Sequence, residues 1–211
     1  MLDVHPPHSR IQGLRDFLLH LLTITIGLLI ALGLEGCVEW ARHRHLRDEA
    51  DANLRQEIQD NQKQVAATSR ALAQERQNLV NILKFLDARS KNQPYDTHAL
   101  SVSFSLGTLH NASWRTASAT GALSYMEYLH VQRFATAYQI QDQFSDLEAQ
   151  TLSEFLQLQS FTVFEFDPNK MAADEAKEAG NEVRLALAHL IALGQIGEAL
   201  TNAYGKALAV D

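Results

Sequence analysis

The most constraining feature of the chain is an apolar run at residues 17–34, FLLHLLTITIGLLIALGL, in which no side chain carries a formal charge. Its eighteen residues reach the length at which an apolar run becomes a candidate membrane span. At about 1.5 Å per residue, a helix of this length covers roughly 27 Å, slightly less than a hydrocarbon core. We therefore predict a transmembrane helix over residues 17–40, after a polar tail of residues 1–16. Trp40 would lie at the interface, where tryptophan is enriched.

In the predicted span, small and polar residues gather on one face. On a helix that turns about 100° per residue, one side holds His20, Thr23, Gly27, Ala31 and Glu35. Small residues four apart let helices pack closely in lipid, and polar side chains are more stable against another helix than against acyl chains. We expect this packing face to support self-association or a membrane partner. The alternative is that this arrangement is a coincidence. Small residues are common in spans, and His20 and Glu35 lie near opposite ends of the span, where they can reach the interfaces.

Basic residues flank the predicted span on both sides. Two arginines precede it and three follow it: Arg10, Arg15, Arg42, Arg44 and Arg47. Trp40, Arg42 and Arg44 are the expected interface anchor. Because cytoplasmic flanks carry the excess of basic residues, the count leans towards a cytosolic carboxyl-terminal domain but leaves the side undecided.

The apolar run is interpreted as a retained anchor. No small-residue cleavage site of the A-x-A type follows it, as a secretory signal would require. The sequence Leu34-Glu35-Gly36-Cys37 is similar to a bacterial lipoprotein cleavage box, in which Cys37 would be lipidated, but Glu35 departs from that pattern.

Composition predicts one helical domain at residues 41–211. The chain has 211 residues with only 10 Gly and 4 Pro, whereas Ala, Leu, Gln and Glu, which lose little rotamer freedom in a helix, are abundant. About 170 residues suffice to bury a core. Cys37 is the single cysteine, so an internal disulfide and a cysteine-based zinc site are excluded.

The first part of this domain reads as one long helix. No Gly or Pro occurs over residues 38–93, and a seam with spacings of three and four contains Ile58, Asn61, Val65, Thr68, Leu72, Glu75, Leu79, Ile82 and Leu86. Because Asn61 and Glu75 interrupt it, the seam favours a bundle helix over a two-stranded coiled coil. Asn92, Gln93 and Pro94 are expected to end the helix.

Three further helices are expected after this break. The alternating run at residues 100–106 is typical of a strand, but a short helix or a packed loop fits it equally well. A short helix follows around Trp114, and a capping box from Ser124 to Glu127 starts the second long helix. Its apolar stripe is Phe134, Tyr138, Ile140, Phe144, Leu147, Thr151, Phe155 and Leu158.

The last helix is expected to begin at Asp167 and Pro168, an N-cap with a first-turn proline. Its predicted seam is Leu185, His189, Ala192, Ile196, Ala199 and Ala203, widened by Leu190, Leu193, Leu200 and Tyr204. The predicted fold is therefore all-α: a transmembrane helix continues into a long helix, which packs with two further long helices and one short helix in an elongated bundle.

The span and its flank resemble a family of uncharacterised bacterial single-span membrane proteins. The matching residues are the GLLIAL stretch at 27–32, then Glu35, Glu39 and Trp40, and further on Glu57 and Asn61. The resemblance implies a single-pass protein of the bacterial inner (cytoplasmic) membrane, and the family brings no known activity with it.

No catalytic or cofactor motif is present. Glu127 and His130 form one E-x-x-H, but helical di-iron sites need two copies, so we expect Glu127 to serve the cap and no metal to bind. Residues 127–211 carry thirteen acidic against five basic side chains, which argues against nucleic acid.

We therefore expect a membrane-anchored structural or partner-binding module without catalytic activity or cofactor. Its partners would be the lipid bilayer and either a second copy or another membrane protein. The alternatives are an oligomeric pore lined by the polar span face, an adaptor or sensor subunit of a membrane complex, and a cryptic enzyme.

Overall fold

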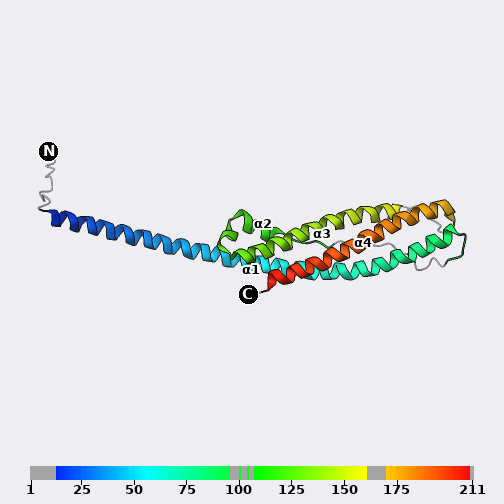
Figure 1. Ribbon diagram of the computed structural model, residues 1–211, viewed down its shortest axis with the longest axis horizontal. Helices are drawn as coiled ribbons and strands as arrows, with labels where there is room; N and C mark the ends of the chain where they lie inside the picture. The colour runs from blue at the N-terminus through cyan, green and yellow to red at the C-terminus, as the bar shows by residue number, and fades with distance from the viewer. Residues whose placement is uncertain (1–12, 96–99, 101–103, 105–106, 161–169, 210–211) are drawn as a thin grey trace, which may run out of the picture. The chain divides into compact units, whose positions relative to one another are not determined.

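The computed structural model describes residues 13–95, 100, 104, 107–160 and 170–209. Within these residues every regular element is helical: α1 (Leu14–Ser90), α2 (Ala112–Ala119), the 3-10 helix η1 (Ala122–Tyr125), α3 (Tyr128–Ser160) and α4 (Ala173–Leu208) (Figure 1). The predicted all-α fold is confirmed. The chain divides into two compact units, Met1–Asp48 and Glu49–Asp211, and α1 contributes residues to both.

The first unit contains the amino-terminal half of α1. Helix α1 begins at Leu14, slightly before the predicted span, and the side chains of residues 13–42 are all exposed. The large apolar side chains of this stretch are each at least 47% exposed, from Ile26 at 47% to Leu14 at 75%. An apolar surface of this extent is not stable in water and needs a cover.

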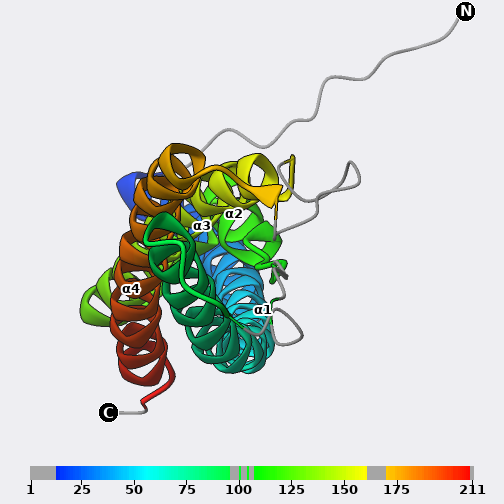
Figure 2. The ribbon, with the colours of Figure 1, turned by 90° about the vertical axis from the view of Figure 1, so that its right-hand side faces the viewer.

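The second unit is a three-helix bundle of α1, α3 and α4. Hydrogen bonds join Glu57 to Tyr138 and Asn61 to Gln141, so α1 and α3 run parallel. Tyr204 contacts Gln141 and His189 contacts Glu154, so α4 runs antiparallel to α3. Figure 2 looks along the bundle and shows the three helices side by side.

The predicted seam of α1 is buried in this bundle. Every predicted position from Ile58 to Leu79 is buried, including the polar Asn61, Thr68 and Glu75, and so is Leu86, whereas Ile82 is half-buried. The helix ends at Ser90, and Asn92 follows with a positive φ of 53°, as the stop signals at 92–94 predicted.

A return segment, defined here as residues 104 and 107–113, brings the chain back along α1 to the start of α3. Phe104 stacks on Phe155 with 4.7 Å between ring centroids, and the backbone of His110 is hydrogen-bonded to Asn61. Residues 107–111 adopt neither strand nor helix, which agrees with the packed-loop alternative; residues 101–103 and 105–106 of the alternating run lie outside the described residues.

The start of α3 differs from the prediction. Ser124 lies inside η1, and the first turn of α3 is capped by Glu127, whose carboxylate accepts from Leu129 N at 3.1 Å and His130 N at 2.9 Å. The predicted capping box was therefore wrong, although its glutamate does cap the helix.

The buried face of α4 agrees with the prediction in part. Of the predicted positions, five are buried (Leu190, Leu193, Leu200, Ala203 and Tyr204), three are half-buried (His189, Ala192 and Ile196), and Leu185 and Ala199 are exposed. The buried residues of α4 are Ala176, Gly180, Val183, Ala186, Leu190, Leu193, Gly197, Leu200, Ala203, Tyr204 and Ala207. The predicted start at Asp167 and Pro168 lies outside the described residues, and α4 is described from Ala173 onwards.

Candidate functional site

The predicted packing face of the span lies on the exposed amino-terminal part of α1. His20, Thr23, Gly27, Ala31 and Glu35 are all exposed. A Cβ atom added at Gly27 would have no atom within 4 Å, so the space beside this glycine is open. His20 Nδ1 lies 3.0 Å from Asp16 O, and Thr23 Oγ1 donates to Leu19 O at 2.9 Å. Backbone carbonyls of the same helix thus partner these two polar side chains.

Two described helices are long and apolar enough to cross a membrane. The best window of α1 has a mean hydropathy of 2.4 and none of it is buried, whereas the best window of α4 reaches 1.3 and is 33% buried. The apolar side of α4 has partners inside the bundle, because Leu193, Leu200 and Tyr204 are completely buried there.

The predicted interface anchor forms a small cluster on α1. The guanidinium of Arg44 lies 5.4 Å from the ring centroid of Trp40, a cation–π distance. Arg44 also lies 3.8 Å from Asp48, and Arg47 donates to Asp48 at 2.7 Å. Trp40, Arg42 and Arg44 are all exposed, as an anchor at a headgroup layer requires.

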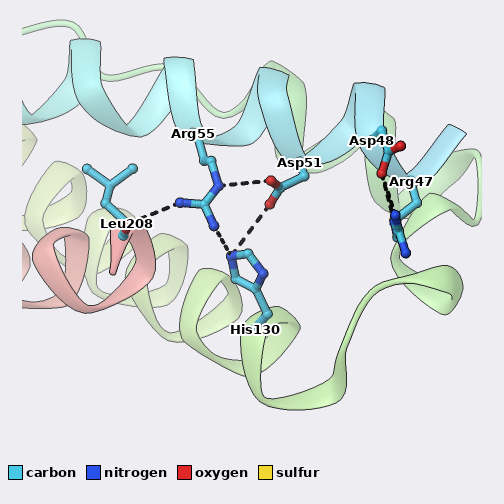
Figure 3. Close-up of polar contacts among 6 residues, drawn as sticks. All are labelled: Arg47, Asp48, Asp51, Arg55, His130 and Leu208. Carbon is cyan, nitrogen blue, oxygen red and sulfur yellow. Dashed lines mark hydrogen bonds and ion pairs between the residues drawn. The ribbon is translucent and has the colours of Figure 1, made fainter. Parts of the chain in front are cut away.

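A polar cluster of Asp51, Arg55, His130 and the Leu208 carbonyl joins α1, α3 and α4 (Figure 3). Arg55 donates to Asp51 Oδ2 at 2.9 Å and to Leu208 O at 3.0 Å, and its third nitrogen lies 3.1 Å from His130 Nε2. The imidazole stacks on Phe134 with 4.6 Å between centroids. One guanidinium therefore satisfies a carbonyl at the end of α4 and ties three helices together.

Deeper in the bundle, Asn61 and Gln141 hold the backbone of His110. Asn61 Nδ2 donates to His110 O at 2.6 Å, and His110 N donates to Asn61 Oδ1 at 2.8 Å. Gln141 Nε2 donates to the same carbonyl at 3.0 Å, and its Oε1 accepts from the Tyr204 hydroxyl at 2.6 Å. Since Asn61, Gln141 and Tyr204 are at most 2% exposed, this network is internal and structural.

Glu57 anchors the start of α2 in the same way. Its carboxylate accepts from the Tyr138 hydroxyl at 2.6 Å and from Ser113 N at 2.9 Å, and the Trp114 ring stacks on Tyr138. Burial, together with the neighbouring Glu57 carboxylate, raises the pKa of Tyr138 far above its usual value, so the hydroxyl remains a donor.

The E-x-x-H pair of Glu127 and His130 is not part of a larger group of metal ligands in the described part of the chain. No group of three or more His, Cys, Asp or Glu side chains is placed there to hold a metal ion, and Glu127 is occupied by backbone amides. Glu127 and His130 stand together in the sequence, but the sequence does not reveal that His130 lies beside Arg55 and Asp51 of α1. The spacing of four between Asp51 and Arg55 was the available signal for half of this cluster.

Comparisons of the chain with protein-family models, with curated proteins and with solved structures give no match.

Proposed function

We propose that this protein is a single-pass, membrane-anchored helical module that binds a protein partner and has no catalytic activity. Helix α1 would cross the bacterial inner membrane at residues 17–40, and the packing face would pair two copies of the span or bind another membrane protein. The bundle would then present its surface to partners on one side of the membrane.

The observation that carries the proposal is the complete exposure of the apolar part of α1. None of its best hydropathy window is buried, and Leu28, Leu29 and Ile30 are each about 60% exposed. Burying an aliphatic side chain of this size is worth about 1.5–3 kcal/mol, so a bilayer around the helix supplies a large favourable free energy.

A single crossing is favoured over two because α4 already has a buried face in the bundle. Moving α4 into lipid would uncover Phe144 of α3, which is 1% exposed and lies against Gly197 of α4, and exposing apolar surface to water is unfavourable. The interior of the bundle therefore supports α4 as a bundle helix.

The pore alternative has weaker support. A water-filled path would use His20 and Thr23 to contact water or ions, but both side chains are partnered by carbonyls of their own helix. If the protein forms a pore, the purified protein should give an ionic current in a planar bilayer, and this current should change in the His20→Leu variant. The absence of current at high protein load would exclude the pore.

Self-association is tested on the packing face. Gly27→Ile puts a branched side chain into the open space beside the packing face, so we expect weaker association in detergent or in a membrane two-hybrid assay. Leu28→Ile is the matched control, because it keeps size and hydrophobicity and lies off the packing face. Equal behaviour of the two variants would contradict association through this face.

A further inference from the structure

The exposed side of α1 within the bundle is basic. Four basic residues occur over residues 61–86, and all of them are exposed: Lys63, Arg70, Arg76 and Lys84. Glu75 is the one acidic residue of this stretch, and it is 3% exposed. The solvent-facing side of this part of α1 therefore carries positive charge with no negative charge to balance it.

Three of these side chains share one face of α1, defined here as the basic face: Lys63, Arg70 and Lys84. Their spacings are multiples of seven residues, close to whole numbers of helical turns. Lys63 is paired with Asp60 at 2.6 Å, whereas Arg70 and Lys84 make no ion pair or hydrogen bond among the described residues. The basic face is roughly 31 Å long at about 1.5 Å per residue.

Helix α3 has an exposed acidic face, defined here as Asp142 and Asp146. These residues lie four apart and share one side of the helix with Ala149, and all three are exposed. Neither carboxylate makes an ion pair or a hydrogen bond among the described residues. No basic residue follows Arg133 in α3, so this face has no cation of its own.

The two faces lie at the same level of the bundle. Asn61 of α1 bonds Gln141 of α3 at 3.0 Å and the two helices run parallel, so residues about 80 positions apart are level. Asp142 and Asp146 are therefore level with the stretch of α1 that begins beside Lys63 and ends one turn before Arg70. The charges of the two faces match in height, yet they do not pair within one chain.

We propose that the basic face of one copy of this protein packs beside the acidic face of a second copy, with the two bundles parallel and level. Lys63 and Arg70 of one copy then lie against Asp142 and Asp146 of the other. Because the contact joins two different faces, it is heterologous and can repeat from copy to copy. It adds a partner for the bundle to the module proposed above, and it does not depend on where the bundle lies relative to the span.

The contact is weak and depends on salt. Exposed ion pairs each contribute little to binding, and the Debye length falls from about 10 Å at 0.1 M salt to about 3 Å at 1 M. Copies therefore associate reversibly, and a covalent trap is needed to measure how often the two faces meet.

Crosslinking between two pools of the full-length protein, distinguished by tags of different size, tests this contact. In a Cys37→Ser background, one pool carries Ala66→Cys beside the basic face and the other carries Ala149→Cys on the acidic face; both positions are exposed. The pools are mixed in a nonionic detergent at low salt and treated with a short bifunctional maleimide.

We expect crosslinks between the pools to exceed random pairing by at least about threefold, within the range of one or two exposed ion pairs. The excess should disappear in about 1 M salt, where these charges are screened. Random pairing at low salt, or an excess that persists at high salt, would overturn the proposal.

Charge reversal tests the residues themselves. Arg70→Glu in the Ala66→Cys pool and Asp146→Lys in the Ala149→Cys pool should each lower the crosslinking between pools by about threefold. A mixture of the two variants should restore it, because opposite charges face each other again. Lys177→Glu, the same charge change at an exposed position of α4, is the matched control and should leave crosslinking unchanged. A mixture of the two variants that stays low would overturn the pairing of Arg70 with Asp146.

Gly27→Ile in both pools separates this contact from association through the span. The crosslinks should persist in this background, because both faces belong to the bundle. Their loss would show that the span alone brings the copies together and would overturn a contact made by the bundle. Their persistence supports the contact whether or not the packing face of the span passes its own test.

Discussion

Among the glycines of the described residues, Gly107 leaves the least room for a side chain. A Cβ atom there would lie 2.5 Å from Thr68 Oγ1 and 3.2 Å from Gln64 Cγ, and the Gly107 amide donates to Glu148 Oε1 at 3.0 Å. We expect Gly107→Ala to lower the free energy of unfolding by about 1–3 kcal/mol, the usual cost of overpacking. Urea unfolding of the protein in detergent measures it.

Gly194→Ala is the control for this substitution. Gly194 lies within α4 and its Cβ would meet nothing within 4 Å, so alanine should raise stability by about 0.5–1 kcal/mol through helix propensity. A loss of stability in both variants would show that the close approach at Gly107 is not the cause.

Glu148 makes stability depend on pH. Its side chain is 5% exposed, and burial raises its pKa, although the hydrogen bond from Gly107 N partly opposes this shift. The folded state therefore holds the proton more tightly than the unfolded chain does. As pH rises above the unfolded carboxyl pKa of about 4.3 and through the raised folded value, this group must ionise while buried, so it reduces stability.

Glu148→Gln keeps an acceptor for the Gly107 amide and removes the ionisation. We expect the variant to gain stability relative to the parent protein as pH rises above the unfolded carboxyl pKa of about 4.3 and through the raised folded value. Urea midpoints across this interval provide the measurement, with the exposed Glu178→Gln as control. Parallel pH profiles for the parent protein and Glu148→Gln would refute the role of this carboxyl group.

At the scale of elements, α3 and α4 pack through Phe144 against Gly197. The Phe144 side chain is 1% exposed, and its ring carbon Cε2 would lie 3.3 Å from a Cβ at Gly197. Phe144→Ala should cost about 3–5 kcal/mol of unfolding free energy, because it empties a core position that rigid neighbours cannot refill. Leu156→Ala, at a 56% exposed position of the same helix, should stay within about 0.5 kcal/mol.

Periodicity predicted the buried face of α1 well and that of α4 in part. On α1 the apolar seam from Ile58 to Leu86 is bordered by charged and amide side chains, so only one face can be buried. On α4 the predicted Leu190, Leu193 and Leu200 are buried, whereas Leu185 is exposed. Packing against Phe144 selects the face with Gly197, a residue that carries no apolar side chain to mark it in the sequence.

The polar network shows a second limit of sequence reasoning. Asn61 looked like an interruption of the seam, yet it is buried because its amide matches the backbone of His110, 49 residues away. The partner is a peptide group, which leaves no trace in side-chain patterns. The predicted packing face and interface anchor of the span follow from helix geometry alone, and they stay predictions.

At the scale of the whole molecule, the two compact units predict that the bundle does not need the span to fold. Removing residues 1–40 should leave a soluble, mostly helical protein with one cooperative urea transition, because the buried residues of α1 begin at Ala50. Circular dichroism and urea unfolding check this. A coil spectrum from the truncated chain would contradict an autonomous bundle.

The hydrogen bond from Arg55 to the Leu208 carbonyl joins residues 153 positions apart. This separation determines when the bundle can close during synthesis. Proteins are made from the amino terminus, so the span has left the ribosome long before residue 208 is translated. The bundle therefore cannot close until translation has passed α4, and its buried faces stay open until then. In the anchored protein proposed above, insertion of the span would precede folding of the bundle, an order imposed by the topology of the chain.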